Sequence, residues 1–269
     1  MTPNNKLAQK RLLIIGGSSG IGLATAQQAT AAGAQTIVAG RSEAKLQAAV
    51  ASMGGDVTTY PVDLTDDASV KSLFEKVGTL DYLVITGPAP NFGHFLELDT
   101  EQVHQEFEGK FWGQYRAVKY AAPHLSKTGA IVLMSGAYSA RPVPGATSLA
   151  AVQAGIEGLA RGLAIDLAPI RVNVISPGLT DTPLIHEFFA DETARKTLYD
   201  EQVQALPARR IGTSDDIAES IMYLLTNSYT TGSTLFPDVG YSLRKDRTFT
   251  TKNTFKYKLI HWIKSKSLS

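Results

Sequence analysis

A glycine-rich segment near the amino terminus has the residue types and spacing of a phosphate-binding turn. Residues 15–22, IGGSSGIG, lie between a short apolar run and an Ala/Gln-rich segment. A turn this tight needs glycine, and a backbone that approaches a pyrophosphate closely needs it again. The amides at the start of the following helix, together with its positive end, attract the phosphate. The order strand, glycines, helix favours a dinucleotide site over a simple turn.

The elements that position this turn follow an alternating pattern. Apolar runs predict strands at 12–15, 36–39, 57–62, 81–85, 130–134, 171–175 and 233–236. Helices are expected at about 21–32, 42–54, 65–78, 100–122, 147–167 and 214–226. Repeated βα units of this size indicate a parallel sheet with right-handed crossovers. We therefore predict an α/β fold, a single-domain Rossmann-like doubly wound parallel sheet with helices on both faces.

Composition limits the class of protein. The chain has 269 residues and no cysteine, so it has no disulfide and no thiolate chemistry. The five histidines show no metal-ligand spacing, and the net charge of +1 does not indicate nucleic acid as a partner. No signal core or run of about 18 apolar residues occurs, so a soluble, cytoplasmic protein is expected. Without a repeat or linker, residues 1–242 are predicted to form one domain.

Charge separates the last residues from the rest. Residues 243–269 contain eight Lys/Arg and one acid, whereas residues 1–242 contain 18 basic and 24 acidic residues. Phe255, Leu259, Trp262 and Ile263 recur at helical spacing among these lysines. A basic amphipathic helix docks on protein, on a sister subunit or weakly on an anionic membrane. Disorder is the remaining interpretation of this tail.

Several motifs together resemble those of the short-chain dehydrogenase/reductase family. The pattern Gly16-x-x-x-Gly20-Ile21-Gly22 is similar to the family's glycine motif. Residues 62–65, VDLT, resemble its adenine-contacting segment, and residues 175–183, ISPGLTDTP, resemble its Pro-Gly loop. Residues 209–218 and 237–242 are similar to its closing segments. The resemblance extends from about residue 10 to 242, with the motifs in the family's order.

The resemblance implies a nicotinamide dinucleotide cofactor. The residues that it assigns to cofactor binding are Gly16, Ser18, Ser19, Ile21, Arg41, Asp63, Leu64, Gly87, Gln153, Pro177, Gly178, Thr180 and Thr182. An NAD site places an acid after the second strand, but this chain has Arg41 there. An arginine pairs well with a 2′-phosphate, so we predict NADP(H). An exposed arginine at a helix start is the alternative interpretation.

The same resemblance implies that the catalytic positions are changed. Family members use Asn, Ser, Tyr and Lys to move a proton at the substrate oxygen. Spacing places Lys110, Gly136, Leu149 and Gln153 at these four positions. Leucine cannot exchange a proton and glutamine carries no charge, although Gln153 retains the ability to bond ribose hydroxyls. Loss of general acid–base assistance typically costs about 10²–10⁴-fold in rate.

A relocated proton-transfer pair is one hypothesis. Lys110 is a cation near the vacant lysine position, Tyr138 lies two residues beyond Gly136, and Ser135 lies one residue before it. We take these three as candidate catalytic residues because titratable groups near a substrate site mark chemistry. In the alternative interpretation, Lys110 pairs with a helix neighbour such as Glu106, and Tyr138 only packs.

Three functions are compatible with this pattern. The first is an NADP(H)-dependent oxidoreductase that moves hydride to a small organic substrate by a non-standard proton path. The second is an inactive NADP(H)-binding sensor or complex subunit, and the third is a lyase, cyclase or isomerase. The segment 184–206 is the expected substrate lid. It contains the large apolar side chains Leu184, Ile185, Phe188, Phe189, Leu198 and Tyr199, which favour an apolar substrate. In the family, the helices expected at 100–122 and 147–167 form subunit contacts, so a homodimer or homotetramer is expected.

Overall fold

The computed structural model describes residues 6–54, 57–88 and 90–244. The apolar stripe expected in the tail lies outside the described residues. Within the described ranges, no helix combines the length and hydropathy that crossing a membrane requires.

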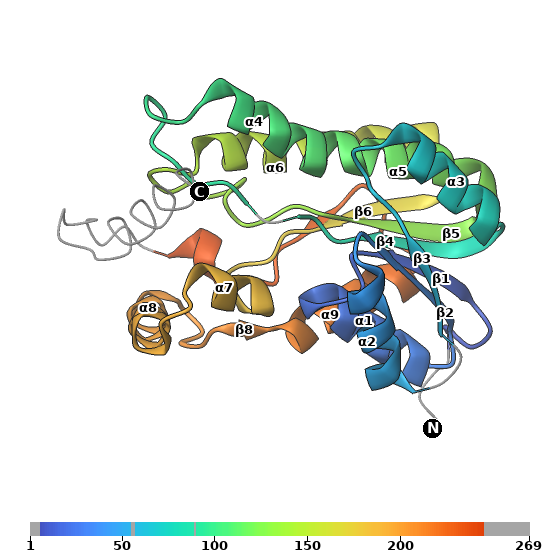
Figure 1. Ribbon diagram of the computed structural model, residues 1–269, viewed down its shortest axis with the longest axis horizontal. Helices are drawn as coiled ribbons and strands as arrows, with labels where there is room; N and C mark the ends of the chain where they lie inside the picture. Colours follow the sequence, from blue (N-terminus) through green and yellow to red (C-terminus); the bar gives the residue numbers. More distant parts are fainter. Residues whose placement is uncertain (1–5, 55–56, 89, 245–269) are drawn as a thin grey trace.

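A seven-stranded parallel sheet forms the centre of the protein (Figure 1). Its order is β3-β2-β1-β4-β5-β6-β9. The strands are β1 (Arg11–Ile15), β2 (Gln35–Gly40), β3 (Val57–Pro61), β4 (Leu80–Ile85), β5 (Leu125–Met134), β6 (Arg171–Ile175) and β9 (Thr234–Leu235). The predicted Rossmann-like fold is confirmed. The order reverses between β1 and β4, and ligands of such sheets bind at the carboxyl ends of the strands at this point.

Helices cover both faces of the sheet. One face carries α1 (Gly20–Ala31), α2 (Glu43–Met53) and α9 (Ser214–Thr226), and the other carries α3 (Asp67–Val77), α4 (Thr100–Phe107), α5 (Gly113–Ala121) and α6 (Thr147–Asp166). Strand side chains alternate between these two layers. Leu13 and Ile15 pack in one core cluster, and Leu12 and Ile14 pack in the other. The apolar run of β1 is therefore buried on both sides.

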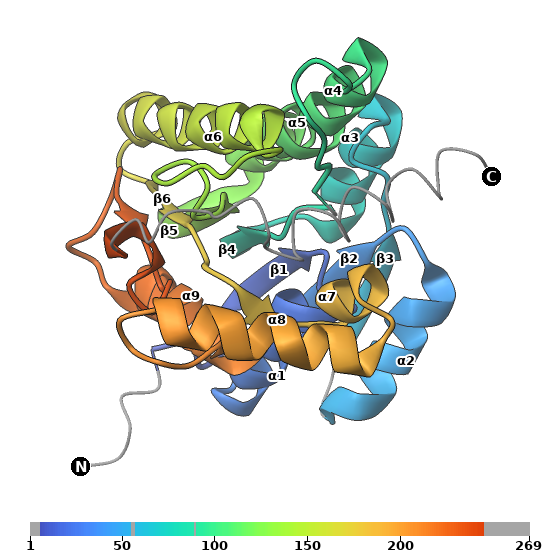
Figure 2. The same ribbon diagram turned by 90° about the vertical axis from the view of Figure 1, so that its left-hand side faces the viewer.

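Two features interrupt this regular plan. A five-residue π-helix, Glu108–Trp112, joins α4 to α5 where one continuous helix is predicted over 100–122. The predicted lid consists of α7 (Pro183–Phe188) and α8 (Glu192–Ala205), held by a two-stranded sheet of β7 (Thr180–Asp181) and β8 (Gly212–Thr213). Figure 2 looks toward this end of the molecule, where α7 and α8 lie opposite α4 and α6.

Candidate active site

The glycine turn after β1 has space only for glycine at two positions. Gly16 has a φ of +85°, and a Cβ there would lie 2.1 Å from Oγ1 of Thr86. A Cβ on Gly22 would lie 2.3 Å from the carbonyl oxygen of Gly16. Helix α1 has no acid in its first turn, and its N-cap residue Ser19 makes no side-chain cap bond. A helix start without an acid or a side-chain cap leaves its backbone amides to a pyrophosphate.

Arg41 and Asp63 lie at the ends of neighbouring strands. Arg41 follows β2 and is exposed, whereas Asp63 follows β3. Hydrogen bonds from the backbone amide and hydroxyl of Thr65, at 2.9 and 2.8 Å, lower the pKa of Asp63, and Arg41 adds a smaller effect. The ionised Asp63 thus fixes its own turn. Arg41, whose charge reaches Asp63, lies on the same edge as the glycine turn, the position expected for a 2′-phosphate contact.

The loop that begins at Pro177-Gly178 reaches the glycine turn at Thr182. A Cβ on Gly178 would lie 2.8 Å from the Cα of Asp238, so the loop packs tightly against the chain after β9. Thr180 is buried and donates its hydroxyl to the carbonyl of Gly178 at 3.0 Å. Thr182 lies 3.7 Å from the position that a Cβ on Gly20 would occupy. The structure therefore brings Thr182 next to the glycine turn.

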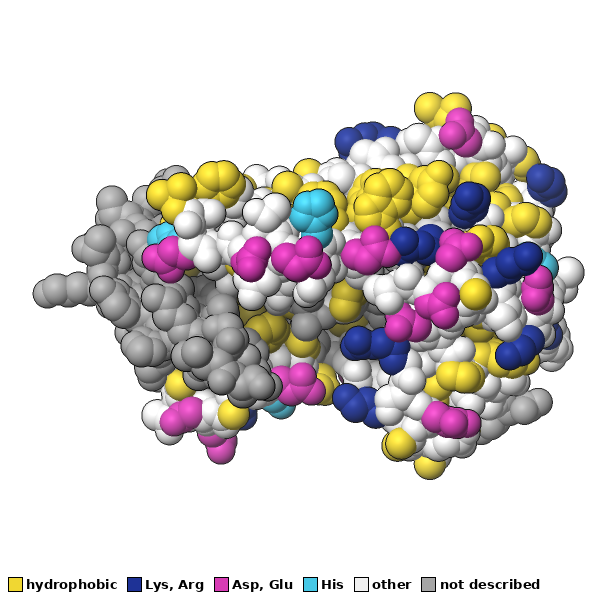
Figure 3. All heavy atoms as spheres, turned by 45° about the horizontal axis from the view of Figure 1, so that its top comes forward, with side chains coloured by type: hydrophobic (Ala, Val, Ile, Leu, Met, Phe, Trp, Pro, Cys, Tyr) yellow, Lys and Arg dark blue, Asp and Glu magenta, His cyan; other side chains and the backbone are white. Residues whose placement is uncertain are grey.

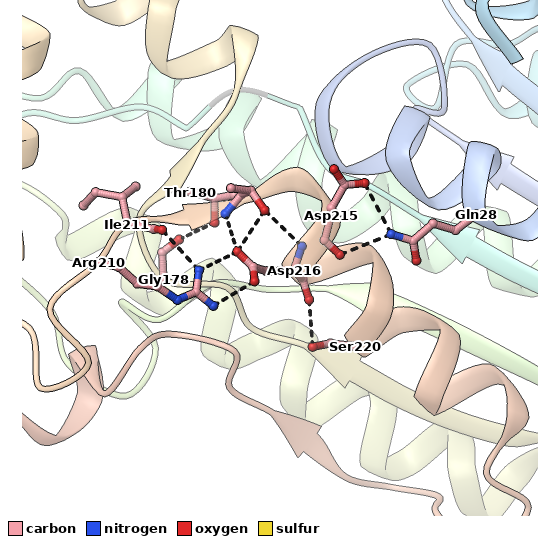
Figure 4. Close-up of polar contacts among 9 residues, drawn as sticks. Gln28, Gly178, Thr180, Arg210, Ile211, Asp215, Asp216 and Ser220 are labelled. Carbon is pink, nitrogen blue, oxygen red and sulfur yellow. Dashed lines mark hydrogen bonds and ion pairs between the residues drawn. The ribbon is translucent and has the colours of Figure 1, made fainter.

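An ion pair between Arg210 and Asp216, here called the charged anchor, supports this loop through β8 (Figure 4). The guanidinium of Arg210 donates to both carboxylate oxygens of Asp216, at 2.6 and 2.7 Å. Thr213 and Asp216 also form a capping box at the start of α9. These bonds, led by that from Arg210, hold the pKa of Asp216 well below its usual range. Since β8 pairs with β7, the anchor fixes the segment that carries Thr180.

Lys110 is buried in the π-helix and points to the loop after β4. Its Nζ donates to the carbonyl oxygen of Pro88 at 2.6 Å and lies 3.8 Å from where a Cβ on Gly87 would be. Burial lowers the pKa of Lys110 to about 8, while the charge of Glu106 acts in the opposite direction. The ammonium can therefore exchange its proton near neutral pH.

Glu106 is a buried acid whose charge acts on Lys110. It is 4% exposed, and its Oε1 accepts from the amide of Asn91 at 3.0 Å. Its Oε2 has no hydrogen-bond partner among the described residues. In the described part of the chain no ion pair joins Glu106 to Lys110, so the two interact through space. The spacing of four residues predicts this proximity, but not the burial.

Gln114 connects the π-helix to β5. Its Nε2 donates to the carbonyls of Lys110 and Met134, at 3.1 and 3.0 Å, and its Oε1 accepts from the amide of Met134 at 2.9 Å. The side chain is 1% exposed. An amide is suited to this position because it both donates and accepts. Sequence reasoning missed Gln114, and no local pattern marks it.

The side chain of Gln153 occupies the space next to Gly136 where a larger residue would place its Cβ. A Cβ on Gly136 would lie 2.3 Å from Nε2 and 2.9 Å from Cδ of Gln153. The Gln153 side chain therefore fills the space that a serine would use at 136. Gln153 is 7% exposed, and its buried Oε1 has no hydrogen-bond partner among the described residues. An unsatisfied amide oxygen is rare inside proteins and fits a hydroxyl of a bound molecule.

Leu149 and Tyr138 belong to an apolar cluster. Leu149 is 1% exposed and packs with Ala146 and Val152. The ring of Tyr138 contacts the rings of Phe92 and Tyr241 edge-on, with centroids 5.8 and 5.9 Å apart. Burial raises the pKa of Tyr138 far above its ordinary value, so its phenol stays protonated. No hydrogen bond joins Tyr138 to Lys110 in the described residues, and the relocated pair stays a prediction.

The hydroxyl of Ser135 is directed to α6. Its hydroxyl lies 3.1 Å from the carbonyl oxygen of Gln153 and 3.0 Å from Oε1 of Glu157. Ser139 donates to the same oxygen of Glu157 at 2.5 Å. Glu157 therefore fixes both ends of the loop that carries Gly136 and Tyr138. Neither Glu157 nor Ser139 was singled out from the sequence, although Glu157 lies one helical turn after Gln153. No described group of three or more His, Asp or Glu side chains is arranged to hold a metal ion.

Comparisons with known proteins identify relatives of this chain. A family model described as enoyl-(acyl carrier protein) reductase matches residues 16–242. The short-chain dehydrogenase/reductase ucsE of an Acremonium species is 32% identical over 261 residues, which are 88% of this chain and 96% of the relative.

Solved structures extend the comparison. A small-chain dehydrogenase in complex with NADPH has a TM-score of 0.74 and 33% identity, covering 87% of this chain and 99% of the other. The MalC reductase/Diels-Alderase of Malbranchea aurantiaca has a TM-score of 0.79 and 27% identity, covering 87% and 97%.

Proposed function

Because this chain belongs to the short-chain dehydrogenase/reductase family, we propose that it binds NADP(H) and transfers hydride to a small, apolar organic substrate. The bound cofactor supplies the hydride from its nicotinamide ring. The proton reaches the substrate by a path that does not use tyrosine and lysine at positions 149 and 153. The observation that carries the proposal is the close glycine turn beside a site whose proton-transfer positions hold Leu149 and Gln153.

The chain's own residues support NADP(H) as the cofactor. Gly16 and Gly22 allow the backbone to approach a pyrophosphate. Arg41 directly follows β2, where its guanidinium could bind a 2′-phosphate. The unpartnered Oε1 of Gln153 is ready to accept from a ribose hydroxyl. The relative solved with NADPH supports the same choice. Arg41→Asp should weaken NADPH binding much more than NADH binding.

Lys110 is the proton source in this proposal. Its ammonium is buried next to Gly87, at the end of β4, and its pKa of about 8 allows proton transfer near neutral pH. Tyr138 contributes a protonated phenol and an aromatic wall together with Phe92 and Phe188. A wall of this kind favours apolar or ring-bearing substrates. Reduction of an activated double bond suits a site with one weak proton donor.

The test combines NADPH titration with a substrate panel of enones and ketones. We expect NADPH to bind and to be consumed with an apolar enone, and turnover to fall as the pH rises above about 8, where Lys110 loses its proton. Lys110→Met should lower turnover and remove this pH dependence, and Tyr138→Phe tests the relocated pair directly. Tight binding without consumption of NADPH by any substrate would instead support a sensor.

A cyclase or isomerase is the second candidate. The relative from Malbranchea aurantiaca is described as both a reductase and a Diels-Alderase, so a protein of this family with 27% identity is linked to ring formation. Buried Leu149 with its aromatic neighbours would hold an apolar polyene in a folded shape. Conversion of a substrate without any consumption of NADPH would identify this activity.

We also expect a homodimer or homotetramer. Trp112 and Tyr115 are 45% and 39% exposed, and their rings contact each other with centroids 5.5 Å apart. Figure 3 shows hydrophobic side chains gathered on this helical layer. Exposed aromatic side chains of this kind favour a contact between subunits.

A further inference from the structure

We propose that the basic segment 245–269 docks on its own molecule, across two acidic segments that flank the substrate end of the site. The first flanking segment is residues 91–101, which lead into α4, and the second is residues 181–201, which contain α7 and most of α8. The proposal concerns the surface that receives the tail, and it does not depend on the reaction that the site performs.

Arg244 is the last described residue, and its side chain is held by Tyr241 and by α8. Arg244 is 9% exposed, and its guanidinium carbon lies 4.0 Å above the ring centre of Tyr241. Its Nη2 donates to the Tyr241 hydroxyl at 3.1 Å, and its Nη1 donates to Oε1 of Gln202, on α8, at 3.4 Å. Arg244 is therefore held beside α8, which carries much of the second flanking segment.

An aromatic row continues from this point to both flanking segments. The ring of Tyr241 contacts that of Tyr138 at 5.9 Å, Tyr138 contacts Phe92 at 5.8 Å, and Phe92 contacts Phe188 at 6.4 Å between centroids. Phe92 belongs to the first flanking segment and Phe188 to the second. As a helix, 25 residues would span about 37 Å. This length exceeds the distance that the three ring contacts cover, so the tail can reach from Arg244 to both segments.

The charges of the tail and the flanking segments are complementary. Residues 91–101 contain three acids and no lysine or arginine, and residues 181–201 contain six acids and two bases. Residues 245–269 contain seven bases and one acid. Figure 3 shows acidic side chains following one another on the helical side of the molecule. Charges of opposite sign attract strongly within the Debye length, about 8 Å at physiological salt.

Apolar surface is available for the tail as well. Phe95 and Leu96, in the first flanking segment, are 73% and 95% exposed. The tail carries Phe255, Leu259, Trp262 and Ile263 at helical spacing. Exposed neighbouring apolar side chains of this size mark a docking surface. An amphipathic helix would place its apolar stripe on them and its lysines against the acids.

The experiment uses Trp262 as the reporter in the full-length chain. The protein has two tryptophans, so Trp112→Phe leaves Trp262 as the single emitter. We would measure its emission maximum and its quenching by acrylamide, in dilute protein at low and at high salt. The test variant is Glu97→Lys/Glu187→Lys, with one reversal on each flanking segment. The control variant is Glu75→Lys/Asp166→Lys, which changes the net charge equally at the opposite edge of the sheet, where α3 and α6 lead into strands.

We expect Trp262 to emit at short wavelength and to be several-fold less quenched than N-acetyltryptophanamide. The test variant should shift the emission to longer wavelength and increase quenching, whereas the control variant should match its parent. Equal behaviour of the two variants would overturn the proposal. So would protection that disappears on dilution together with a loss of mass in light scattering, because the tail would then bind a second copy. Protection that appears only with vesicles containing phosphatidylserine would overturn it in favour of a membrane.

Discussion

Replacing Gly136 with alanine tests whether the Gln153 side chain occupies the space that a Cβ at position 136 needs. The new Cβ would lie 2.3 Å from Nε2 of Gln153 and 2.9 Å from its Cδ, so the amide must rotate away. Insertion of a methyl group into a packed region typically costs about 1–3 kcal/mol. Alanine in place of glycine offsets about 0.4–1 kcal/mol of this through the unfolded chain. The central values leave a net loss of about 1.3 kcal/mol, within a range of up to about 2.6 kcal/mol. Each kcal/mol lowers Tm by roughly 2–4 °C.

A double-mutant cycle separates this clash from other causes. Gly136→Ala/Gln153→Ala removes the side chain that the methyl group meets, so the two changes should be coupled by about 0.5–3 kcal/mol. Gly162→Ala is the matched control, because a Cβ there meets nothing within 4 Å. Urea denaturation of the four proteins and the control measures these free energies. If Gly136→Ala is as stable as its parent, or if the two changes are additive, the proposed overlap is wrong.

Four further predictions follow from the site and its supports. Gly22→Ala should abolish NADPH binding, because its Cβ would lie 2.3 Å from a backbone oxygen that cannot move away; retained affinity in a fluorescence titration would contradict this. Burial lowers the pKa of Lys110 from 10.5 to about 8. Between about pH 8 and pH 10.5, Lys110 is therefore protonated in the unfolded chain but deprotonated in the folded protein. Relative to Lys110→Met, the parent should therefore gain stability as the pH rises from about 8 to 10.5, by roughly 3 kcal/mol at most; parallel pH profiles of the two proteins would exclude it. Asp216 has a lowered pKa, so its contribution is complete above about pH 3.9 and is lost as the pH falls below that value; Asp216→Asn should flatten this part of the acid unfolding curve. Trp112→Lys should reduce the mass measured by light scattering if the exposed aromatic pair with Tyr115 forms the subunit contact, and an unchanged mass would exclude this contact.

The sequence predicts the central strands of the sheet well because they are buried on both faces. Such strands are continuous apolar runs bounded by glycine or polar residues, as at 12–15 and 171–175. The expected strand 171–175 agrees with β6, and the expected helix 214–226 agrees with α9. The glycine turn is also recognisable, since only glycine allows the φ of +85° at Gly16 beside Thr86.

The site is less predictable because it depends on contacts between distant segments. The π-helix has no local signature, and it sets the direction of Lys110. The overlap of Gly136 and Gln153 joins residues that are 17 positions apart. The spacing predicts that both residues occupy altered family positions, but only the fold brings them together. The burial of Glu106 and Gln114 depends in the same way on packing between distant elements, since α4 packs against α6 and α5 packs against β5.

The amide bridge of Gln114 makes two halves of the site mechanically dependent on each other. One side chain holds the carbonyl of Lys110 and, through Met134, the strand end that precedes Gly136. A molecule that displaced the π-helix by even a fraction of an ångström would therefore pull on β5 as well. Engineering of either half in isolation would strain the other, so redesign of this protein should treat residues 108–114 and 134–136 as one unit.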